Sequence, residues 1–314
     1  MTQLSLGPRA CGAVMAGLVA FLLLSGPVAV MEAQELEPGA YAVAPVGLNV
    51  FVVSNTLSIG DMAFDPSGPI EDARGTINAT SVGYGRALNI AGRSGQIAIA
   101  VPIVVGHLQG QYLGEFAEVD RYGPGDPRFR IAVNLYGAPA MNLKSFVANR
   151  PSRLVGVSLT VSMPFGRYSS ERLINIGNDR WAFKPEIGVV QTIGRWTVEA
   201  YGGAWFFTDN DVFYRGSVRT QAPIASTQLH LQYAIRPRML LSGNVNYYAG
   251  GRSTVNGRQN FDLQRNSRVG ITMARPLSGG RTLRVAVSRG AYTTIGADFT
   301  SVSVAFQRMW GGTQ

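Results

Sequence analysis

The chain contains few cysteines, histidines and lysines, and few charged residues of any kind. Among its 314 residues are one cysteine, Cys11, and two histidines, and Asp, Glu, Lys and Arg together make up 15%, against about 25% in an average globular protein. Because Cys11 lies in the first segment, disulfides, thiol nucleophiles and zinc–thiolate sites are excluded from the rest of the chain. A hydrophobic content of 46% with so few charges also excludes an intrinsically disordered chain.

Long apolar runs are scarce as well, since only the stretch Ala13–Leu24 approaches the length of a membrane span. This excludes a multi-helix membrane protein. The stretch follows a basic start and ends at helix-breaking residues, a pattern typical of an export signal. We therefore predict a signal peptide over residues 1–33, with cleavage after Ala33 or Ala29, and an N-terminal segment over residues 34–46. A retained anchor helix is disfavoured because the apolar stretch is short.

After position 45, apolar residues recur at every second position, which predicts β-strands. In one clear case Val155, Val157 and Leu159 alternate with Gly, Ser and Thr. A soluble sandwich would instead expose an alternate face rich in Lys and Glu. Twelve strands are predicted, near residues 47–58, 75–88, 95–106, 127–138, 153–164, 180–193, 196–207, 224–235, 239–249, 265–275, 281–291 and 298–310.

An even number of strands, joined by connections that alternate in length, is typical of a bacterial outer-membrane barrel. The connections at 139–152 and 292–297 break the alternation, and the register of the first two strands stays open because neither has one clean apolar face. We predict an all-β fold, a single closed antiparallel transmembrane β-barrel of about 12 strands over residues 47–314, located in the bacterial outer membrane. Long loops are expected at 59–74, 107–126, 165–179, 208–223 and 250–264.

Two hairpins fix which side of each strand faces lipid. A two-residue turn at Gly194-Arg195 pairs Ile193 with Trp196 and Val189 with Ala200, which makes one face almost wholly apolar and leaves every charge of the hairpin on the other. In the next hairpin, a three-residue turn over 236–238 keeps the apolar faces aligned, setting Ile235, Tyr233, Leu231 and Leu229 against Met239, Leu241, Gly243 and Val245. A charge facing lipid near mid-bilayer costs about 2–4 kcal/mol, so the charged face must line the lumen.

Several motifs in the second half of the chain point to a family. They are Arg-Leu-Ile-Asn-Ile-Gly-Asn-Asp-Arg-Trp at 172–181, Phe-Lys-Pro-Glu at 183–186 and Trp-Phe-Phe-Thr-Asp-Asn at 205–210, followed by glycines at 250, 251 and 257 and Gly-Ala-Asp-Phe at 296–299. From about residue 40, and most strongly over 160–300, the chain resembles the phenol meta-pathway family of outer-membrane transporters, found near catabolic genes for aromatic compounds. The resemblance implies a barrel related to uptake channels for hydrophobic compounds. The last strand also resembles the C-terminal assembly signal of outer-membrane proteins, with Val304, Phe306 and Trp310 on one parity and four residues after Trp310.

One stretch of the predicted inner wall combines both signs of charge with an aromatic ring. The predicted pore-lining residues are Lys184, Glu186, Glu199 and Tyr201, with Arg180, Asp209 and Asn210 at the outer end of the same hairpin. These residues would form a polar constriction that a permeating solute passes. The alternative is a charge-paired network that only fills the lumen, because an unpaired charge in a narrow barrel is costly to desolvate.

The predicted function is an outer-membrane channel for passive uptake of small hydrophobic compounds, with aromatic compounds as candidates. The alternative is a structural or adhesive outer-membrane protein that acts through its long loops. A barrel-wall lipid hydrolase is disfavoured because His230 and Ser226 are expected to face the lumen, opposite Asn244 and Asn246, rather than lipid. We therefore predict no enzyme, no cofactor and no metal site.

The expected partners follow from charge and location. The net charge is +9, and of 28 basic residues only Lys144 and Lys184 are lysine. Arginine binds phosphate through two parallel hydrogen bonds, so lipopolysaccharide phosphates and anionic solutes are possible contacts, although a codon-biased genome rich in Arg is an equal explanation. Outer-membrane lipid, the outer-membrane assembly machinery and a small apolar solute complete the predicted partners. Nucleic acid is excluded because the basic residues are scattered and no recognition motif accompanies them.

Overall fold

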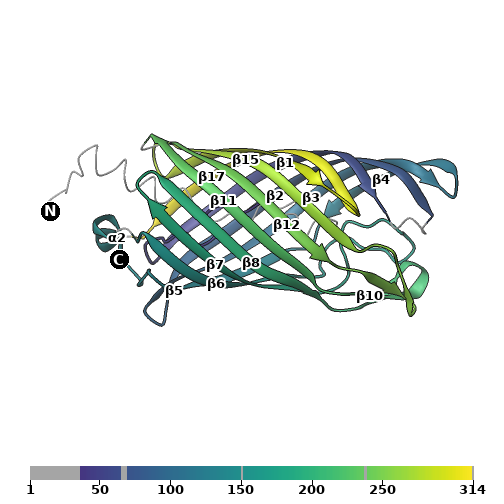
Figure 1. The fold of residues 1–314 in the computed structure, drawn as a ribbon, viewed down its shortest axis with the longest axis horizontal. Helices are drawn as coiled ribbons and strands as arrows, with labels where there is room; N and C mark the ends of the chain where they lie inside the picture. The colour runs from purple at the N-terminus through teal and green to yellow at the C-terminus, as the bar shows by residue number, and fades with distance from the viewer. Residues whose placement is uncertain (1–35, 65–68, 150, 237–238, 313–314) are drawn as a thin grey trace.

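The fold is a closed barrel, seen here in a computed structural model that describes residues 36–64, 69–149, 151–236 and 239–312. In this part of the chain, β3 pairs with both β2 and β5, which closes a ring in the order β1-β2-β3-β5-β6-β7-β8-β11-β12-β15-β16-β17, with every pair antiparallel (Figure 1). The twelve strands are β1 Leu48–Ala63, β2 Ile70–Ile90, β3 Arg93–Tyr112, β5 Arg128–Tyr136, β6 Arg153–Ser162, β7 Ala182–Ile193, β8 Trp196–Phe207, β11 Ile224–Arg236, β12 Met239–Gly250, β15 Gln264–Pro276, β16 Arg281–Tyr292 and β17 Gly296–Gly311. The predicted fold class is confirmed.

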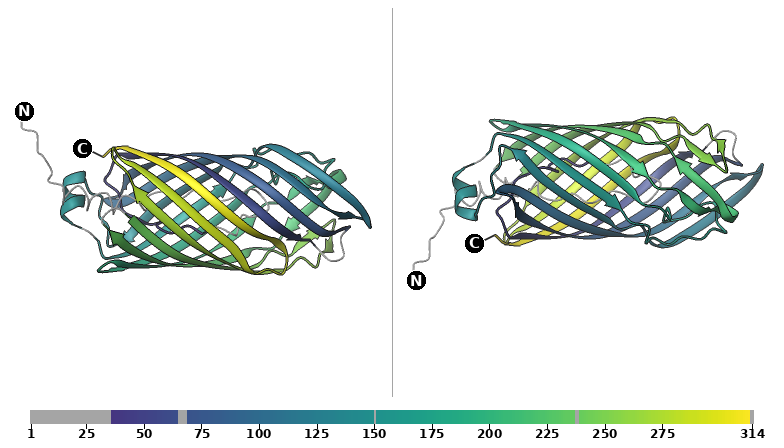
Figure 2. Two further views of the ribbon diagram at one scale, coloured as in Figure 1. Left: turned by 90° about the horizontal axis from the view of Figure 1, so that it is seen from above. Right: turned by 90° about the horizontal axis from the view of Figure 1, so that it is seen from below.

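The two rims of the barrel differ. Short connections such as 91–92, 194–195 and 277–280 lie at one rim, which we call the turn end, and Leu48 pairs with Gly311 at this rim. Apart from the connection between β5 and β6, the longer connections gather at the opposite rim, which we call the loop end (Figures 1 and 2). The predicted signal peptide lies outside the described residues. Within them, no helix is long and apolar enough to cross a membrane.

The lipid-facing and lumen-facing sides of the β7–β8 hairpin are as predicted. Ile193 pairs with Trp196 and Val189 with Ala200, and the outward side chains of this face are exposed apolar groups. Lys184, Glu186 and Glu199, on the other parity, are buried inside the barrel. An apolar outer wall around a polar interior is what a barrel surrounded by hydrocarbon requires.

The next hairpin confirms the predicted register away from its turn but not at the turn itself. Tyr233 pairs with Leu241 and Leu231 with Gly243, as predicted, whereas Arg236 rather than Ile235 pairs with Met239. A shift in register between Ala234 and Arg236 inserts one extra residue. Because of this bulge, the side chains of β11 and β12 point to the same sides as a three-residue turn would place them, although the turn is shorter. Residues 237 and 238 of the turn lie outside the described residues.

Two of the expected long loops, 59–74 and 107–126, are instead largely extensions of the barrel strands. β1 continues to Ala63 and β2 begins at Ile70, while β3 runs to Tyr112 and is followed by β4 (Glu115–Pro124), which pairs with the loop-end half of β3. In these extensions the inward side chains of Met62 and Leu108 are apolar, whereas outward positions such as Asp61 and His107 are polar. The pattern of apolar residues outside and polar residues inside, which reveals the strands nearer mid-membrane, is therefore not continued. Strand length was therefore underestimated there.

The connections 208–223 and 250–264 form a small sheet of their own at the loop end. It contains β9 (Asn210–Phe213), β10 (Ser217–Gln221), β13 (Ser253–Val255) and β14 (Arg258–Gln259), in the order β14-β13-β10-β9, with the short helix η2 (Tyr214–Gly216) between β9 and β10. We call this four-stranded sheet the cap. Figure 1 shows β10 of the cap at the rim farthest from helix α2 (Leu143–Ala148).

The long connection at 139–152 carries α2 at the turn end. Asn142 caps the helix by accepting a hydrogen bond from the backbone N–H of Ser145, as residues of this type commonly do. Phe146 is buried in the same apolar cluster as Met141 and Val43. The connection is longer than a tight turn because it packs against the N-terminal segment.

The packing of β1 and β2 explains why neither strand has one purely apolar face. In β1 the inward side chains of Leu48 and Val50 are buried in an apolar cluster, while the outward Phe51 and Val53 are exposed. Both parities are therefore apolar. The outward face of β2 is partly polar, and its Asn78 exchanges side-chain hydrogen bonds with Asn55 of β1 at 2.8 and 3.2 Å.

The outward face should tolerate charge poorly. Ile187 is 53% exposed on the outer wall of β7, so Ile187→Arg is expected to destabilise the barrel by about 2–4 kcal/mol through the cost of placing a guanidinium in hydrocarbon. Val218→Arg, on the exposed side of the cap, is the matched control and should change stability little. Urea unfolding in lipid vesicles measures both. Equal stability losses for the two variants would show that the β7 face is assigned wrongly.

Candidate functional site

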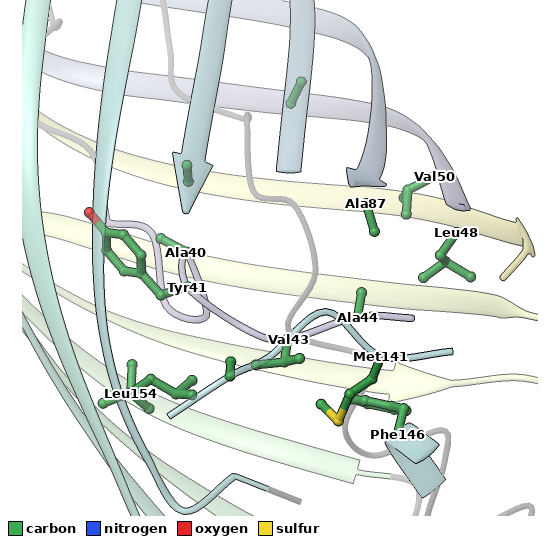
Figure 3. Close-up of a cluster of buried hydrophobic side chains, with 14 of the residues drawn as sticks. Ala40, Tyr41, Val43, Ala44, Leu48, Val50, Ala87, Met141, Phe146 and Leu154 are labelled. Atoms are coloured by element: carbon green, nitrogen blue, oxygen red, sulfur yellow. The ribbon is translucent and has the colours of Figure 1, made fainter. Parts of the chain in front are cut away.

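Residues 36–47 precede β1 and run inside the barrel near the turn end, and we call them the plug segment. Figure 3 shows Tyr41, Val43 and Ala44 beside inward side chains of the wall such as Leu48 and Leu154. Pro38 and Pro45 lack the backbone N–H that a ladder requires. The segment accordingly folds into turns, with the N–H of Ala42 bonded to the carbonyl of Gly39 and that of Leu48 bonded to Pro45.

The wall holds Tyr41 in a socket formed by two glycines. Gly156 of β6 and Gly188 of β7 are paired across the two strands. A Cβ atom on Gly188 would lie 2.2 Å from a carbon of the Tyr41 ring, and one on Gly156 would lie 2.4 Å from it. The ring packs edge-on against Tyr201, with 5.1 Å between centroids. Only glycine leaves room for the Tyr41 ring at these two positions.

Lumenal side chains satisfy the backbone of the plug segment. Glu199 Oε2 accepts a hydrogen bond from the N–H of Gly39 at 2.7 Å, and the hydroxyl of Tyr201 accepts one from the N–H of Ala40 at 3.2 Å. Three further side chains, Gln96, Arg130 and Asn134, donate to the carbonyls of Ala40 and Tyr41 at 2.7, 3.0 and 3.2 Å. The segment is thus held by side chains rather than by strand pairing.

The hydroxyl of Tyr41 lies in a cluster of charged and polar side chains. It lies 3.1 Å from Glu186 Oε1 and 3.0 Å from the hydroxyl of Ser158. Lys184 Nζ lies 3.4 Å from Glu186 Oε2, and both side chains are almost fully buried. A buried ion pair of this kind needs additional hydrogen bonds to offset desolvation, and Tyr41 supplies one of them.

Glu37 of the plug segment is also buried beside this cluster. Burial raises the pKa of its carboxyl above the ordinary 4.5, and neighbouring Glu186 adds to the rise, while Lys184 and Arg130 oppose it. The pKa of the Tyr41 hydroxyl is raised as well, first by burial and then by Glu186. Both groups therefore favour their neutral forms in the docked segment.

The seven predicted pore-lining residues do not form one group. Lys184, Glu186, Glu199 and Tyr201 come together on the inner wall, against the plug segment. Arg180 and Asn210 are buried nearer the loop end, where Arg180 Nη2 donates to Gln221 Oε1 at 2.5 Å and Asn210 Nδ2 donates to the Tyr168 hydroxyl at 3.1 Å. Asp209 is exposed to solvent and is not brought to the lumen.

Sequence reasoning missed the plug contacts of Tyr41, Glu37 and Arg130. The expected patch was defined only by residues of one hairpin, and nothing in the periodicity of the strands reports on a segment that precedes them. One usable signal was present, because Gly156 and Gly188 occupy lumen-facing positions on neighbouring strands. Two adjacent inward glycines indicate that another group approaches the wall closely.

The residues considered for a hydrolase do not form a nucleophilic relay. His230 is fully buried in the lumen and its Nδ1 lies 2.9 Å from Asn244 Oδ1. Within the described residues, no hydrogen bond links Ser226 to His230, and Nε2 of His230 has no partner. The pair also faces inward, away from lipid substrates. The predicted assembly-signal residues Val304, Phe306 and Trp310 lie on the outer face of β17.

Comparison with known proteins agrees with this geometry. The family described as "Putative MetA-pathway of phenol degradation" matches residues 71–302. The chain belongs to this family. The membership confirms the resemblance seen in the sequence motifs. No curated protein matches the chain.

Among solved structures, the COG4313 outer membrane channel from Pseudomonas putida F1 is similar to this member of the phenol-degradation family with a TM-score of 0.74 and 20% identity, over 88% of this chain and 100% of that chain. The β domain of the Bordetella autotransporter Brka has a TM-score of 0.49 and 10% identity, over 84% of this chain and 100% of that chain. The first similarity shows that the fold is that of an outer-membrane channel.

The glycine socket gives a direct test of the plug segment. In Gly188→Val the new side chain would overlap the Tyr41 ring, so the segment should undock and single-channel conductance in planar bilayers should rise several-fold. Gly202→Val is the matched control, because a Cβ at Gly202 on β8 meets no atom within 4 Å. If both variants conduct like the wild type, the segment does not limit the lumen.

The raised pKa of Glu37 predicts a pH dependence of docking. A raised pKa means that the docked segment binds the proton more tightly, so docking is strongest below about pH 4.5 and weakens as pH rises through the raised value. Conductance should therefore be lowest near about pH 4 and should increase as the pH rises above the ordinary pKa of a glutamate. In Glu37→Gln this increase should largely disappear, whereas the exposed Glu71→Gln should retain it. An unchanged slope in Glu37→Gln would refute the assignment.

Proposed function

We propose that this protein is an outer-membrane channel through which small hydrophobic compounds, aromatic ones included, enter the cell passively. Membership of the phenol-degradation family and the channel fold support this role. The finer assignment rests on the lining of the lumen at the loop end.

The lumen at the loop end is apolar over β1, β2, β3 and β17. Met62, Ile77, Val104, Leu108 and Phe299 point inward there and are buried in one cluster. Ile174 and Ile176, from the connection between β6 and β7, cover the cluster. A channel for hydrophilic solutes would place polar or charged side chains at such positions. An apolar solute can replace the two isoleucines without leaving a polar group unsatisfied.

The plug segment then closes the path below the apolar cluster. It is fixed by hydrogen bonds to side chains, each worth about 0.5–1.5 kcal/mol net, and it lies outside the strand ladder. Its displacement breaks no barrel strand. In this proposal the wall residues that hold the plug segment in place form a latch rather than an open constriction. The latch consists of Lys184, Glu186, Glu199 and Tyr201.

The location and the partners belong to the same proposal. We expect the loop end to face the cell surface, where exposed arginines meet lipopolysaccharide, and the turn end to face the periplasm. Val304, Phe306 and Trp310 would be read by the outer-membrane assembly machinery.

Uptake of an apolar aromatic dye by intact cells tests the function. N-phenyl-1-naphthylamine fluoresces once it passes the outer membrane, and cells that produce the barrel should take it up faster than cells without it. Val104→Thr places a hydroxyl in the apolar lumen at almost constant volume, and a poorly partnered polar group of this kind costs about 1–3 kcal/mol. Uptake should fall by about fivefold at the lower end of this cost and by about 150-fold at its upper end.

The adjacent Val105→Thr, which faces lipid, is the matched control and should leave uptake unchanged. No acceleration of uptake by the wild-type barrel would contradict the channel and favour a structural or adhesive protein. Equal uptake by the two valine variants would exclude the apolar cluster as the path.

A further inference from the structure

A polar patch interrupts the apolar outer wall on β1 and β2. It consists of Asn55, Asn78 and Thr80, and we call it the amide patch. Asn55 is exposed, and Asn78 and Thr80 are partly exposed on the same outward side. Val53 and Leu57, the outward neighbours of Asn55 along β1, are exposed apolar groups. A polar side chain that faces hydrocarbon costs free energy unless its hydrogen-bonding groups are paired.

The amide patch lies near the middle of the apolar band of the wall. Toward the turn end, Trp310 pairs with Asn49 and its ring lies 6.3 Å from that of Tyr84, an aromatic pair of the kind found at membrane interfaces. Toward the loop end, Asp61 forms an exposed ion pair with an arginine of β2. Asn55 lies midway between Asn49 and Asp61 on β1, about 20 Å along the strand from each.

The three side chains use only part of their hydrogen-bonding capacity on one another. Asn55 Nδ2 donates to Asn78 Oδ1 at 2.8 Å and to the Thr80 hydroxyl at 2.9 Å, and Asn78 Nδ2 donates to Asn55 Oδ1 at 3.2 Å. A side-chain amide has two N–H donors and an oxygen that accepts two bonds. Within the described residues, one N–H of Asn78, the hydroxyl hydrogen of Thr80 and one acceptor site on each amide oxygen therefore have no partner.

These remaining groups are complementary to themselves. The amide patch offers both donors and acceptors, and the acyl chains of lipids have neither. A second copy of this chain spans the same membrane and presents the same patch at the same height. When two copies are related by a twofold axis along the membrane normal, the donors of each patch face the acceptors of the other. Asparagine side chains promote the association of membrane helices in the same way.

The wall around the amide patch allows two copies to approach closely. The outward neighbours are aliphatic and uncharged, namely Val53 and Leu57 of β1, Val82 of β2, and Val302 and Val304 of β17. Two copies in contact would therefore surround the paired amides with an aliphatic rim. Such a rim excludes competing hydrogen-bond partners from the centre of an interface.

We propose that this face of the barrel, centred on the amide patch, is the interface of a twofold-symmetric dimer in the membrane. The dimer is independent of the proposed channel function and of the solute that passes the lumen. Each copy keeps its own closed ring of strands, because the contact uses outward side chains and leaves the strand pairing intact.

Replacement of the amides tests the interface. Asn55→Leu combined with Asn78→Leu places apolar side chains toward lipid, so the barrel should stay folded while the dimer dissociates at least tenfold more readily. Energy transfer between dye-labelled barrels in phospholipid vesicles, measured over a range of protein-to-lipid ratios, gives the dimer affinity. Thr227→Leu is the matched control, because Thr227 is exposed on β11 across the ring and its hydroxyl donates to the carbonyl of Tyr247 at 3.3 Å.

Cysteine crosslinking provides a second measurement that leaves the amides unchanged. Leu57 pairs with Asn78 beside the amide patch, whereas Leu229 is 52% exposed on the outer wall of β11, across the ring. Leu57→Cys and Leu229→Cys are each combined with Cys11→Ser, so that the new residue is the only cysteine. During copper-phenanthroline oxidation of native membranes, Leu57→Cys should form a covalent dimer at least tenfold faster than Leu229→Cys.

Three results would overturn the dimer interface. They are a wild-type barrel that stays monomeric at every protein-to-lipid ratio, a double variant that associates as tightly as Thr227→Leu, and equal crosslinking rates for the two cysteine variants. A crosslinked product with the mass of a different protein would also refute a second copy as the partner. The heat-dependent gel mobility of a folded barrel shows that each variant is folded. If the double variant does not fold, the two cysteine variants decide the question.

Discussion

The structure depends first on the rule that a backbone inside a membrane must find its hydrogen-bond partners within the protein. Twelve strands meet this rule only when the last strand pairs with the first, and β1 pairs with β17 continuously from Leu48–Gly311 to Ala63–Gly296. Closure sets which side chains point inward. The plug segment must therefore pack against the lumen-facing side chains that the strand pairing has set.

A ring of twelve strands is wider than wall side chains alone can fill, and two different solutions occur along its axis. Toward the loop end, large apolar side chains such as Phe299 and Leu108 meet a covering connection. Toward the turn end, a separate segment enters, and glycines in the wall make room for its tyrosine. Polar side chains of the wall bond to the backbone of the plug segment there: Glu199 accepts from the N–H of Gly39, and Gln96 donates to the carbonyl of Ala40.

The sequence predicts the strands and their lipid-facing residues, but it does not predict the contacts inside the lumen. Strand positions and the facing of Ile187 or Glu199 followed from the period of two, because lipid permits only apolar side chains on the outer face. The same reasoning did not resolve the first strand. Its inward-facing Val50 packs against the plug segment and is apolar, so both faces of the strand carry apolar residues. The grouping of Lys184 with Glu199 was predictable from hairpin register alone. Their contact with a segment about 150 residues away in sequence has no periodic signature.

The way in which the plug segment is held limits which solutes can displace it. Its peptide groups are bonded to Glu199, Tyr201, Gln96 and Arg130, and each group left unsatisfied in the lumen would cost about 1–3 kcal/mol. A purely apolar solute cannot replace these bonds, so the segment can leave only as water enters beside the solute. A solute with one polar end can satisfy part of the exposed groups itself. Under the proposed channel function, we therefore expect molecules that combine an apolar body with a single hydrogen-bonding group to pass more readily than pure hydrocarbons.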